Sequence, residues 1–472
     1  MARPNVLQIV VDDLGFGDIG CFNYGITDTP ALDRLFAESV QLSQHYSASP
    51  VCAPARAALF TGRYPHRTGA VDTLDGRGLD RIALDEDTLA DALAAAGYTT
   101  GLVGKWHSGA LDPRFHPTRR GFHEFVGFQG GWMDYWDWTI QKGDVVRRAD
   151  GRYLTDVWTD EAVDFLRRHQ QDPFYLHLAY NAPHAPFQAP DGMIDKHLAR
   201  GNNPAVAALY AMVEAMDTGI ARVLAELDRL GLADNTVVLF TSDNGPQMRG
   251  HGPEATDRFN CGFRGSKGHT YEGGIRVPGL IRWPDGMDGG TRVDAMIHFT
   301  DWYPTILAMA GAPSVNPDLA RDGADMFAAL RGESGDVPEQ RFWQWNRYRP
   351  VGVCNAAMRD GHWKLVLPEI ESAMHVTADD LEMDRALRYE PDRFTHIRTD
   401  PMPPMPVITE DEVRPELYNL AIDPLELDDL AAAEPDRVRR MRAELDAWFT
   451  DAQRPDLGAD ASALRRDWTV VS

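Results

Sequence analysis

The chain has 472 residues, of which 43% are hydrophobic and 10% aromatic, and its formal net charge is −24. This composition is typical of a packed globular protein and excludes a disordered chain. The acidic balance argues against nucleic acid or an anionic membrane as the main partner, because both require a basic face, whereas a few local cations suffice to hold a small anionic ligand.

Strand-like and helical segments alternate through the first half of the chain. Residues 5–11 form a continuous apolar run, as expected for a strand that is buried on both faces. The alternation predicts an α/β fold with a large, mostly parallel sheet covered by helices. The further predicted strands cover residues 98–107, 173–184 and 235–244, and the predicted helices cover residues 86–96, 158–169 and 205–230.

Oxygen-bearing side chains stand at the carboxyl ends of two predicted strands. Asp12 and Asp13 follow the first strand, and Asp243 and Asn244 end a later one. Parallel sheets bind their ligands at this edge, and carboxylate and amide oxygens suit Ca²⁺ or Mg²⁺ better than zinc. Either pair alone also fits a helix cap or a solvated turn, so the metal site depends on their convergence.

Two other predicted strands end in a lysine or a histidine. Lys105 and His107 end the strand at residues 98–107, and His184 ends the strand at residues 173–184. The chain uses arginine for nearly all of its cations, which base composition can explain. The few lysines, Lys105 and Lys267 among them, also fit sites that need a compact ammonium group.

The character of the sequence changes near residue 338. The segment AAMRDGHWKLVLP has an Asp-Gly turn between two strand-like runs, which is typical of a β-hairpin. We therefore expect a large domain at residues 1–337 and a smaller α+β domain with an antiparallel sheet at residues 338–472. Residues 388–412 are rich in proline and charge and predict a long surface loop.

The cysteines and the N-terminus bear on the compartment. Four cysteines fit neither a zinc spacing nor a disulfide framework, which favours a reducing compartment. The start MARPNVLQIVVDD lacks the pattern of a secretory signal, and no apolar run reaches the about 18 residues of a membrane-spanning helix. We expect a cytoplasmic protein, or a periplasmic or secreted one if a signal was removed.

The stretch SPVCAPARAALFTGR contains the most distinctive motif. Cys52 is followed by Pro54 and Arg56, and then by Leu59 and a Thr-Gly-Arg. This pattern resembles the signature of the type I sulfatases, of the arylsulfatase and carbohydrate sulfatase branch. Segments at residues 11–18, 97–109, 181–187, 240–245 and 265–278 resemble later motifs of that family in the same order.

The resemblance implies an alkaline-phosphatase-like fold and a modified nucleophile. A maturation enzyme would read the motif on the unfolded chain and oxidise Cys52 to formylglycine, whose hydrate attacks sulfur and becomes sulfated. Arg56 would steady the hydrate. The hydrate at Cys52 would also contact a Ca²⁺ ion, in preference to Mg²⁺, and the protein ligands of this ion would be Asp12, Asp13, Asp243 and Asn244.

The resemblance also gives roles to the lysines and histidines. Lys105 and Lys267 would neutralise charge on the sulfuryl oxygens. His184 would protonate, or hydrogen-bond to, the leaving oxygen, and His107 would take a proton from the second hydroxyl of the hydrate, which expels sulfate. The unmodified alternative, a buried structural Cys52, would leave these residues without a common task.

The substrate is indicated less directly. Residues 128–138 (FQGGWMDYWDW) and 342–349 (FWQWNRYR) are dense in aromatic side chains, which fit either sugar stacking or ordinary core packing. The segment PTRRGFHEFVGF resembles the carbohydrate-directed branch, so we expect a sulfated sugar, with aryl sulfates as further substrates. Two alternatives stay open: a phosphonate or phosphate ester hydrolase of the same superfamily, and a non-catalytic protein that binds sulfated carbohydrate.

Overall fold

A ten-stranded, mostly parallel sheet forms the centre of the computed structural model, which describes residues 3–394, 396–404 and 413–454. Strands β8, β1, β7, β3 and β4 are parallel neighbours, whereas β9, β5 and β6 run antiparallel to theirs. The predicted α/β class is confirmed. In spatial order the strands are β10 (Thr291–His298), β2 (Val40–Tyr46), β9 (Gly279–Arg282), β8 (Thr236–Ser242), β1 (Asn5–Val11), β7 (Phe174–Ala179), β3 (Thr99–Lys105), β4 (Glu124–Phe128), β5 (Thr139–Lys142) and β6 (Val145–Arg148).

Helices bury both faces of this sheet. Alternate residues of β1 enter opposite cores, Leu7 and Ile9 on one side and Val6 and Val10 on the other. This explains why the strand is apolar throughout rather than alternating. The first core is completed by α2 (Pro30–Glu38), α6 (Leu154–Arg168) and α8 (Pro204–Arg229), and the second by α3 (Cys52–Thr61), α5 (Leu89–Ala95), α10 (Trp302–Ala310) and α11 (Phe327–Leu330). The shorter helices are α1 (Gly20–Asn23), α4 (Pro65–Thr68), α7 (Met193–Ala199) and α9 (Glu272–Ile275).

Apart from those of β1, the predicted element bounds differ from the observed ones by one to five residues, and two of these differences are informative. The helix expected from residue 86 begins at Leu89, because Thr88 caps it: the Thr88 hydroxyl accepts from the Asp91 amide at 3.2 Å, and the Asp91 carboxylate accepts from the Thr88 amide at 2.9 Å. The strand expected to end at His184 ends at Ala179, so His184 belongs to the turn that follows β7.

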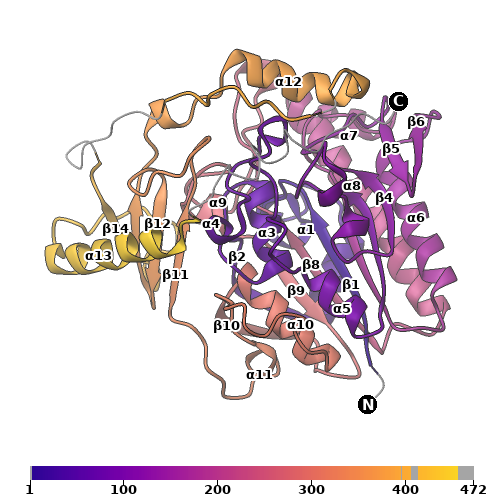
Figure 1. Ribbon diagram of the computed structural model, residues 1–472, viewed down its shortest axis with the longest axis horizontal. Coiled ribbons are helices and arrows are strands. Elements are labelled where there is room, and N and C mark those ends of the chain that lie inside the picture. Colours follow the sequence, from indigo (N-terminus) through magenta and orange to yellow (C-terminus); the bar gives the residue numbers. More distant parts are fainter. Residues whose placement is uncertain (1–2, 395, 405–412, 455–472) are drawn as a thin grey trace.

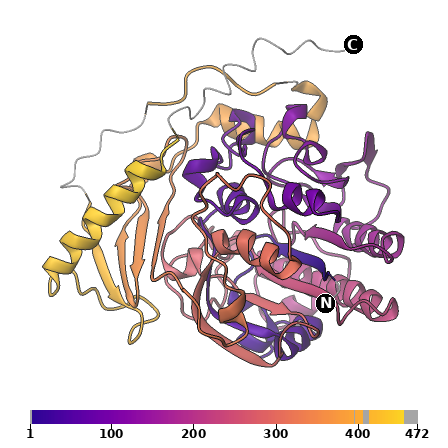
Figure 2. The same cartoon turned by 60° about the horizontal axis from the view of Figure 1, so that its bottom comes forward.

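A second, four-stranded antiparallel sheet lies beside the first. Its hairpin forms at the predicted Asp-Gly turn, and α13 (Pro435–Ala452) covers the outer face of the sheet (Figure 2). The predicted domain boundary after residue 337 stays a prediction. The strands are β11 (Gln340–Gln344), β12 (Ala356–Asp360), β13 (Trp363–Leu367) and β14 (Glu416–Asn419).

The inner face of the second sheet packs on the first unit through buried polar contacts. Lys364 on β13 lies 2.9 Å from the Glu272 carboxylate of α9 and 2.8 Å from that of Glu426, and all three side chains are nearly or fully buried. Arg341 on β11 pairs with Asp301 at 2.6 Å. Buried charges of this kind are tolerated only when paired, so these contacts fix how the two sheets meet.

The structure corrects the start of the loop predicted at residues 388–412, whereas residues 396–404 contain no helix or strand, as predicted. Helix α12 (Ala378–Tyr389) includes the first two of these residues, and a short 3-10 turn follows at Pro391–Arg393. Thr377 caps α12 by accepting from the Asp380 amide at 3.3 Å. Residues 395 and 405–412 of the predicted loop lie outside the described residues. In Figure 1, α12 lies at the end of the molecule opposite the N-terminus.

Two further observations concern the compartment. All four cysteines are free thiols, as their spacing predicted. Among the helices that the structure describes, none combines the length and the apolar character needed to cross a membrane.

Helix α13 offers a test of how the second sheet is held. Trp448 stacks on Phe342 of β11 with ring centroids 5.2 Å apart and contacts Tyr64 edge-on at 5.1 Å. We expect Trp448→Ala to reduce the stability by about 3 kcal/mol or more, because it empties a buried aromatic site. Calorimetry should show a lower melting temperature than for Trp136→Ala, whose side chain is 39% exposed. Equal melting temperatures for the two variants would contradict this packing account.

Candidate active site

The acidic residues predicted to bind metal meet at the carboxyl edge of the sheet. Strands β1 and β8 are parallel neighbours with Val11 opposite Ser242, so the residues that follow these strands also lie side by side. The Asp13 amide donates to the Asp243 carboxylate at 3.3 Å. Asn244 Nδ2 in turn donates to the Asp13 carboxylate, at Oδ1, at 2.8 Å.

Cys52 lies at the same centre, at the first position of α3. Its side chain is 3% exposed, and its sulfur lies within 4.8 Å of carboxylate oxygens of Asp12 and Asp243. Arg56 is one helical turn further on, and its Nε and Nη2 atoms lie 2.9 and 2.8 Å from Asp243 Oδ2. The spacing of four residues puts Cys52 and Arg56 on the same face of α3. Both are therefore held against the acids of β1 and β8.

Two lysines complete the charge network. Lys105 Nζ lies 2.6 Å from Asp12 Oδ2, and Lys267 Nζ lies 2.8 Å from Asp13 Oδ2. Burial alone would raise the pKa of Asp13, but the Lys267 charge and its hydrogen bond outweigh this effect and hold the pKa well below its usual range. Burial and the neighbouring charge of Asp243 raise the pKa of Asp12 to about 7.

The two histidines are neutral at physiological pH. Burial and the Lys267 charge lower the pKa of His184 to about 3, and its Nε2 lies 3.8 Å from Asp13 Oδ2. Burial and the Lys105 charge lower the pKa of His107 well below its usual value. Asp13 and His107 also have left-handed backbone angles, with φ of 65° and 47°, which are uncommon for non-glycine residues.

The donor set fits a hard divalent cation. Asp12 Oδ1 and Asn244 Oδ1 are buried and have no hydrogen-bond partner among the described residues. Buried oxygens left in this way normally serve a ligand or an ion, because an unmet acceptor is costly. The set of carboxylate and amide oxygens is the one that Ca²⁺ and Mg²⁺ prefer. These residues could therefore hold such an ion beside Cys52.

A cavity of about 490 Å³ opens over this centre. Its floor includes Cys52, Lys267 and the two histidines, so the predicted reactive groups face one space. Its volume suits a small molecule of one or a few rings. The cavity is lined by Val51, Cys52, Thr73, Leu74, His107, Gly131, Trp132, His184, Ala185, Pro186, Gln247, Lys267, Arg347, Val376, Leu381, Asp384, Arg385 and Tyr389.

Several of these lining residues were not predicted. The stretch at residues 128–138 supplies Gly131 and Trp132 to the lining, and the stretch at residues 342–349 supplies Arg347. By contrast, Tyr135, Trp138 and Trp343 are buried packing residues. The packing interpretation is thus confirmed for these three residues, and sugar stacking stays a prediction for Trp132. The residues of α12 were missed altogether, although a Thr cap followed by an amphipathic pattern was the signal that could have found the helix.

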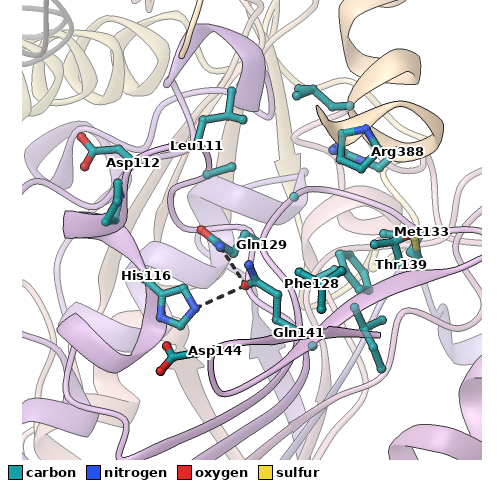
Figure 3. Close-up of a pocket in the computed structure, with 18 of the residues that line it drawn as sticks. Leu111, Asp112, His116, Phe128, Gln129, Met133, Thr139, Gln141, Asp144 and Arg388 are labelled. Carbon is teal, nitrogen blue, oxygen red and sulfur yellow. Dashed lines mark hydrogen bonds between the residues drawn. The ribbon is translucent and has the colours of Figure 1, made fainter. Parts of the chain in front are cut away.

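The structure has a second cavity of about 680 Å³, which Figure 3 shows. None of the predicted site residues lines it. Gln129 donates to Gln141 Oε1 at 2.9 Å, and His116 Nε2 lies 3.3 Å from the same oxygen. Gly130 and Arg388 border this cavity, while the residues next to them in the chain border the active-site cavity. Consecutive residues of two segments therefore line the two cavities.

The fold and the acidic, cysteine-containing centre define a hydrolase of the alkaline-phosphatase-like class. The Sulfatase family profile matches residues 4–312. The chain is similar to the steryl-sulfatase of Mus musculus (33% identity over 450 residues, 76% of this chain and 69% of the relative) and to the N-acetylgalactosamine-6-sulfatase of Homo sapiens (34% over 369 residues, 71% and 67%). Its structure resembles that of Ps i-CgsB, with a TM-score of 0.78 and 29% identity over 96% of this chain and 94% of the other.

The chain therefore belongs to the sulfatase family, and it is a sulfuric ester hydrolase. This membership favours sulfate esters over the phosphonate and phosphate esters that the sequence left open. The complete set of reactive groups around one cavity argues against a protein that only binds.

The acidic centre predicts cation binding that can be measured without turnover. A cation at one hundred times its dissociation constant stabilises a protein by about 2.7 kcal/mol. We expect Ca²⁺ or Mg²⁺ to raise the melting temperature of the native sequence, and Asp12→Asn to remove most of this rise. Asp217→Asn is the control, because Asp217 is also a buried acid but is not one of the predicted ligands. Its carboxylate caps α2 by accepting from the Ala31 and Leu32 amides. Equal cation affinity of the three proteins by titration calorimetry would exclude Asp12 as a ligand.

Proposed function

We propose that the protein hydrolyses the sulfate monoesters of a sulfated carbohydrate, with a formylglycine made from Cys52 as the nucleophile. One observation carries this proposal: Cys52, the two histidines and Lys267 share the floor of one cavity, beside an oxygen-rich set of acids. Burial raises the pKa of the Cys52 thiol, so the unmodified side chain would stay protonated and unreactive.

We infer that the maturation enzyme acts before the chain folds. Cys52 is 3% exposed at the first position of α3, so its side chain is out of reach of the active site of another protein. Arg56 and Asp243 would then close over the modified residue as the fold forms, since their ion pair is fully buried.

Ca²⁺ is the metal that we propose, held by Asp12, Asp13, Asp243 and Asn244 beside residue 52. Ca²⁺ accepts six to eight oxygen ligands with flexible geometry, whereas Mg²⁺ demands a near-ideal octahedron and keeps several waters. The site mixes carboxylate and amide oxygens under the constraint of three buried ion pairs, which suits the more permissive ion. A bound cation would supply a Lewis acid for the sulfate oxygens.

The remaining polar residues would hold the sulfate group and move protons. Lys105 and Lys267 are fixed by Asp12 and Asp13, so their ammonium groups can stabilise charge that develops on sulfate without reorganising. Because His107 is neutral, it can accept a proton. His184 Nδ1 lies 2.7 Å from the Ala185 carbonyl oxygen, which leaves Nε2 for the leaving oxygen of the ester. The negative charge of a bound ester favours the protonated form of this imidazole.

The cavity wall and the relatives support a sugar as the alcohol part. Trp132 and Tyr389 contact one another edge-on, with ring centroids 5.8 Å apart, and both line the cavity, as aromatic rings do in sugar sites. Ps i-CgsB has also been solved in complex with k-i-k-neocarrahexaose, and one relative is named for N-acetylgalactosamine. Steryl-sulfatase is named for a sterol, so a sterol sulfate belongs in the substrate panel.

The nucleophile is tested by loss of sulfate release. Cys52→Ala should abolish release from a sulfated monosaccharide and from an aryl sulfate, because neither thiol nor aldehyde can form. Ion chromatography measures the sulfate, and mass spectrometry measures formylglycine in the native sequence. Cys354→Ala is a matched control, since Cys354 is equally buried but lies outside the cavity. Full activity of Cys52→Ala would falsify the proposed nucleophile.

The role of His184 is tested by the quality of the leaving group. General acids contribute about 10²- to 10⁴-fold. We expect His184→Ala to lower kcat for a sugar sulfate about 100-fold and kcat for a nitrophenyl sulfate less than tenfold, because a phenolate leaves without a proton. His116→Ala, in the second cavity, should change neither rate. If His184→Ala slows both substrates equally, His184 is not the acid.

A further inference from the structure

One face of α12 forms a wall of the active-site cavity. Leu381, Asp384, Arg385 and Tyr389 line it, and their spacing of three and four residues puts them on the same side of the helix. Leu381 is 56% exposed and Tyr389 is 41% exposed. These apolar groups face the cavity rather than the core, so this side of α12 is suited to contact with a ligand rather than to packing within the fold.

Arg385 differs from the other cations of this cavity. Lys267 is paired with Asp13, and Arg347 is paired with Asp72 at 3.0 Å. Arg385 is exposed and makes no hydrogen bond or ion pair with any residue that the structure describes. One turn along α12, Arg388 is buried and bound to Asp75. The helix therefore uses one arginine for structure and leaves the neighbouring one available at the cavity.

An available guanidinium at this position is best explained by an anionic ligand. The chain carries 71 acidic residues against 47 lysines and arginines, so acidic partners are plentiful for a surface arginine. A guanidinium presents a planar fork of donors that matches a sulfate or a carboxylate. The sulfate that is cleaved must reach Cys52 and Lys267, which come from α3 and from the segment after β8. The α12 wall is a separate part of the cavity and would meet a different group.

We propose that Arg385 binds a second anionic group of the substrate, either a sulfate or a carboxylate, while Tyr389 and Leu381 cover the apolar face of the sugar. The preferred substrate then carries at least two anionic groups, on one sugar or on adjacent sugars. This inference rests on the proposed function, because it concerns the same cavity and the same class of ligand.

Binding to a protein that cannot turn over tests the inference apart from catalysis. In the Cys52→Ala background, calorimetry would compare an N-acetylhexosamine 6-sulfate, the same sugar with a second sulfate, and a 6-sulfated disaccharide with a uronic acid. We expect the second anion to tighten binding about tenfold, as a charge-assisted hydrogen bond does at a partly exposed site. A higher salt concentration should reduce this preference.

Arg385→Gln should remove the preference and leave the affinity for the monosulfated sugar unchanged, and Arg385→Lys should retain part of it. Arg393→Gln is the control, because this substitution removes the same charge from an exposed arginine nearby in the sequence. Arg393 does not line the cavity. With formylglycine at residue 52, Arg385→Gln should raise KM for the dianionic sugars and leave kcat unchanged, because the lost contact is the same in the ground and transition states.

The outcomes separate the inference from the function on which it rests. Equal affinity of the native site for the mono- and dianionic sugars would overturn the second anion site. So would an Arg385→Gln variant that loses the same affinity for monoanionic as for dianionic sugars. Sulfate release with no such preference would leave the proposed function intact. A dianion preference that depends on Arg385, without sulfate release from the matured protein, would support the site and reject the function. The two dianionic probes show whether the second anion is a sulfate or a carboxylate.

Discussion

The catalytic end of this fold depends on the pairing of buried opposite charges. Three acids at the ends of β1 and β8 each have a cation within 2.8 Å: Asp12 with Lys105, Asp13 with Lys267, and Asp243 with Arg56. An isolated charge at this depth would cost several kcal/mol, so each partner holds the other in place. The cations come from three different parts of the chain, and the pairs therefore lock α3, β3 and the segment after β8 onto one edge of the sheet.

The same pairing prepares the centre for an anionic substrate. The lysines are fixed before any ligand arrives, and the buried free oxygens of Asp12 and Asn244 remain available to a cation. Two neutral imidazoles lie among these charges, since burial and the nearby lysines disfavour their protonated forms. The result is a site in which fixed cations, free oxygens and neutral imidazoles lie around one centre, as the proposed hydrolysis of a sulfate ester would require.

The sequence alone predicted which polar residues meet at this sheet edge. It did not predict that α12 forms a wall of the cavity over them. Apolar runs such as residues 5–11 mark strands buried on both faces, and polar residues directly after them must meet at one edge. The end of β7 was misplaced, because the turn that carries His184 continues the apolar pattern. Helix α12 was missed, although Thr377 caps it, and the loop predicted from composition at residues 388–412 overlaps only its last two residues. That Trp132, Arg347 and Arg385 share one cavity depends on contacts between distant segments, which no local pattern encodes.

The position of α12 separates the chemistry of the enzyme from its selectivity. Every residue of the charge network lies before residue 270, whereas α12 lies in the chain between β13 and β14 of the second sheet and lines the cavity from there. The cavity-facing side chains of α12 can therefore be exchanged without disturbing the three ion pairs of the centre. A library confined to the cavity face of this one helix would keep the reaction constant and vary only which esters are accepted. The chain thus offers a natural division between a part to preserve and a part to redesign.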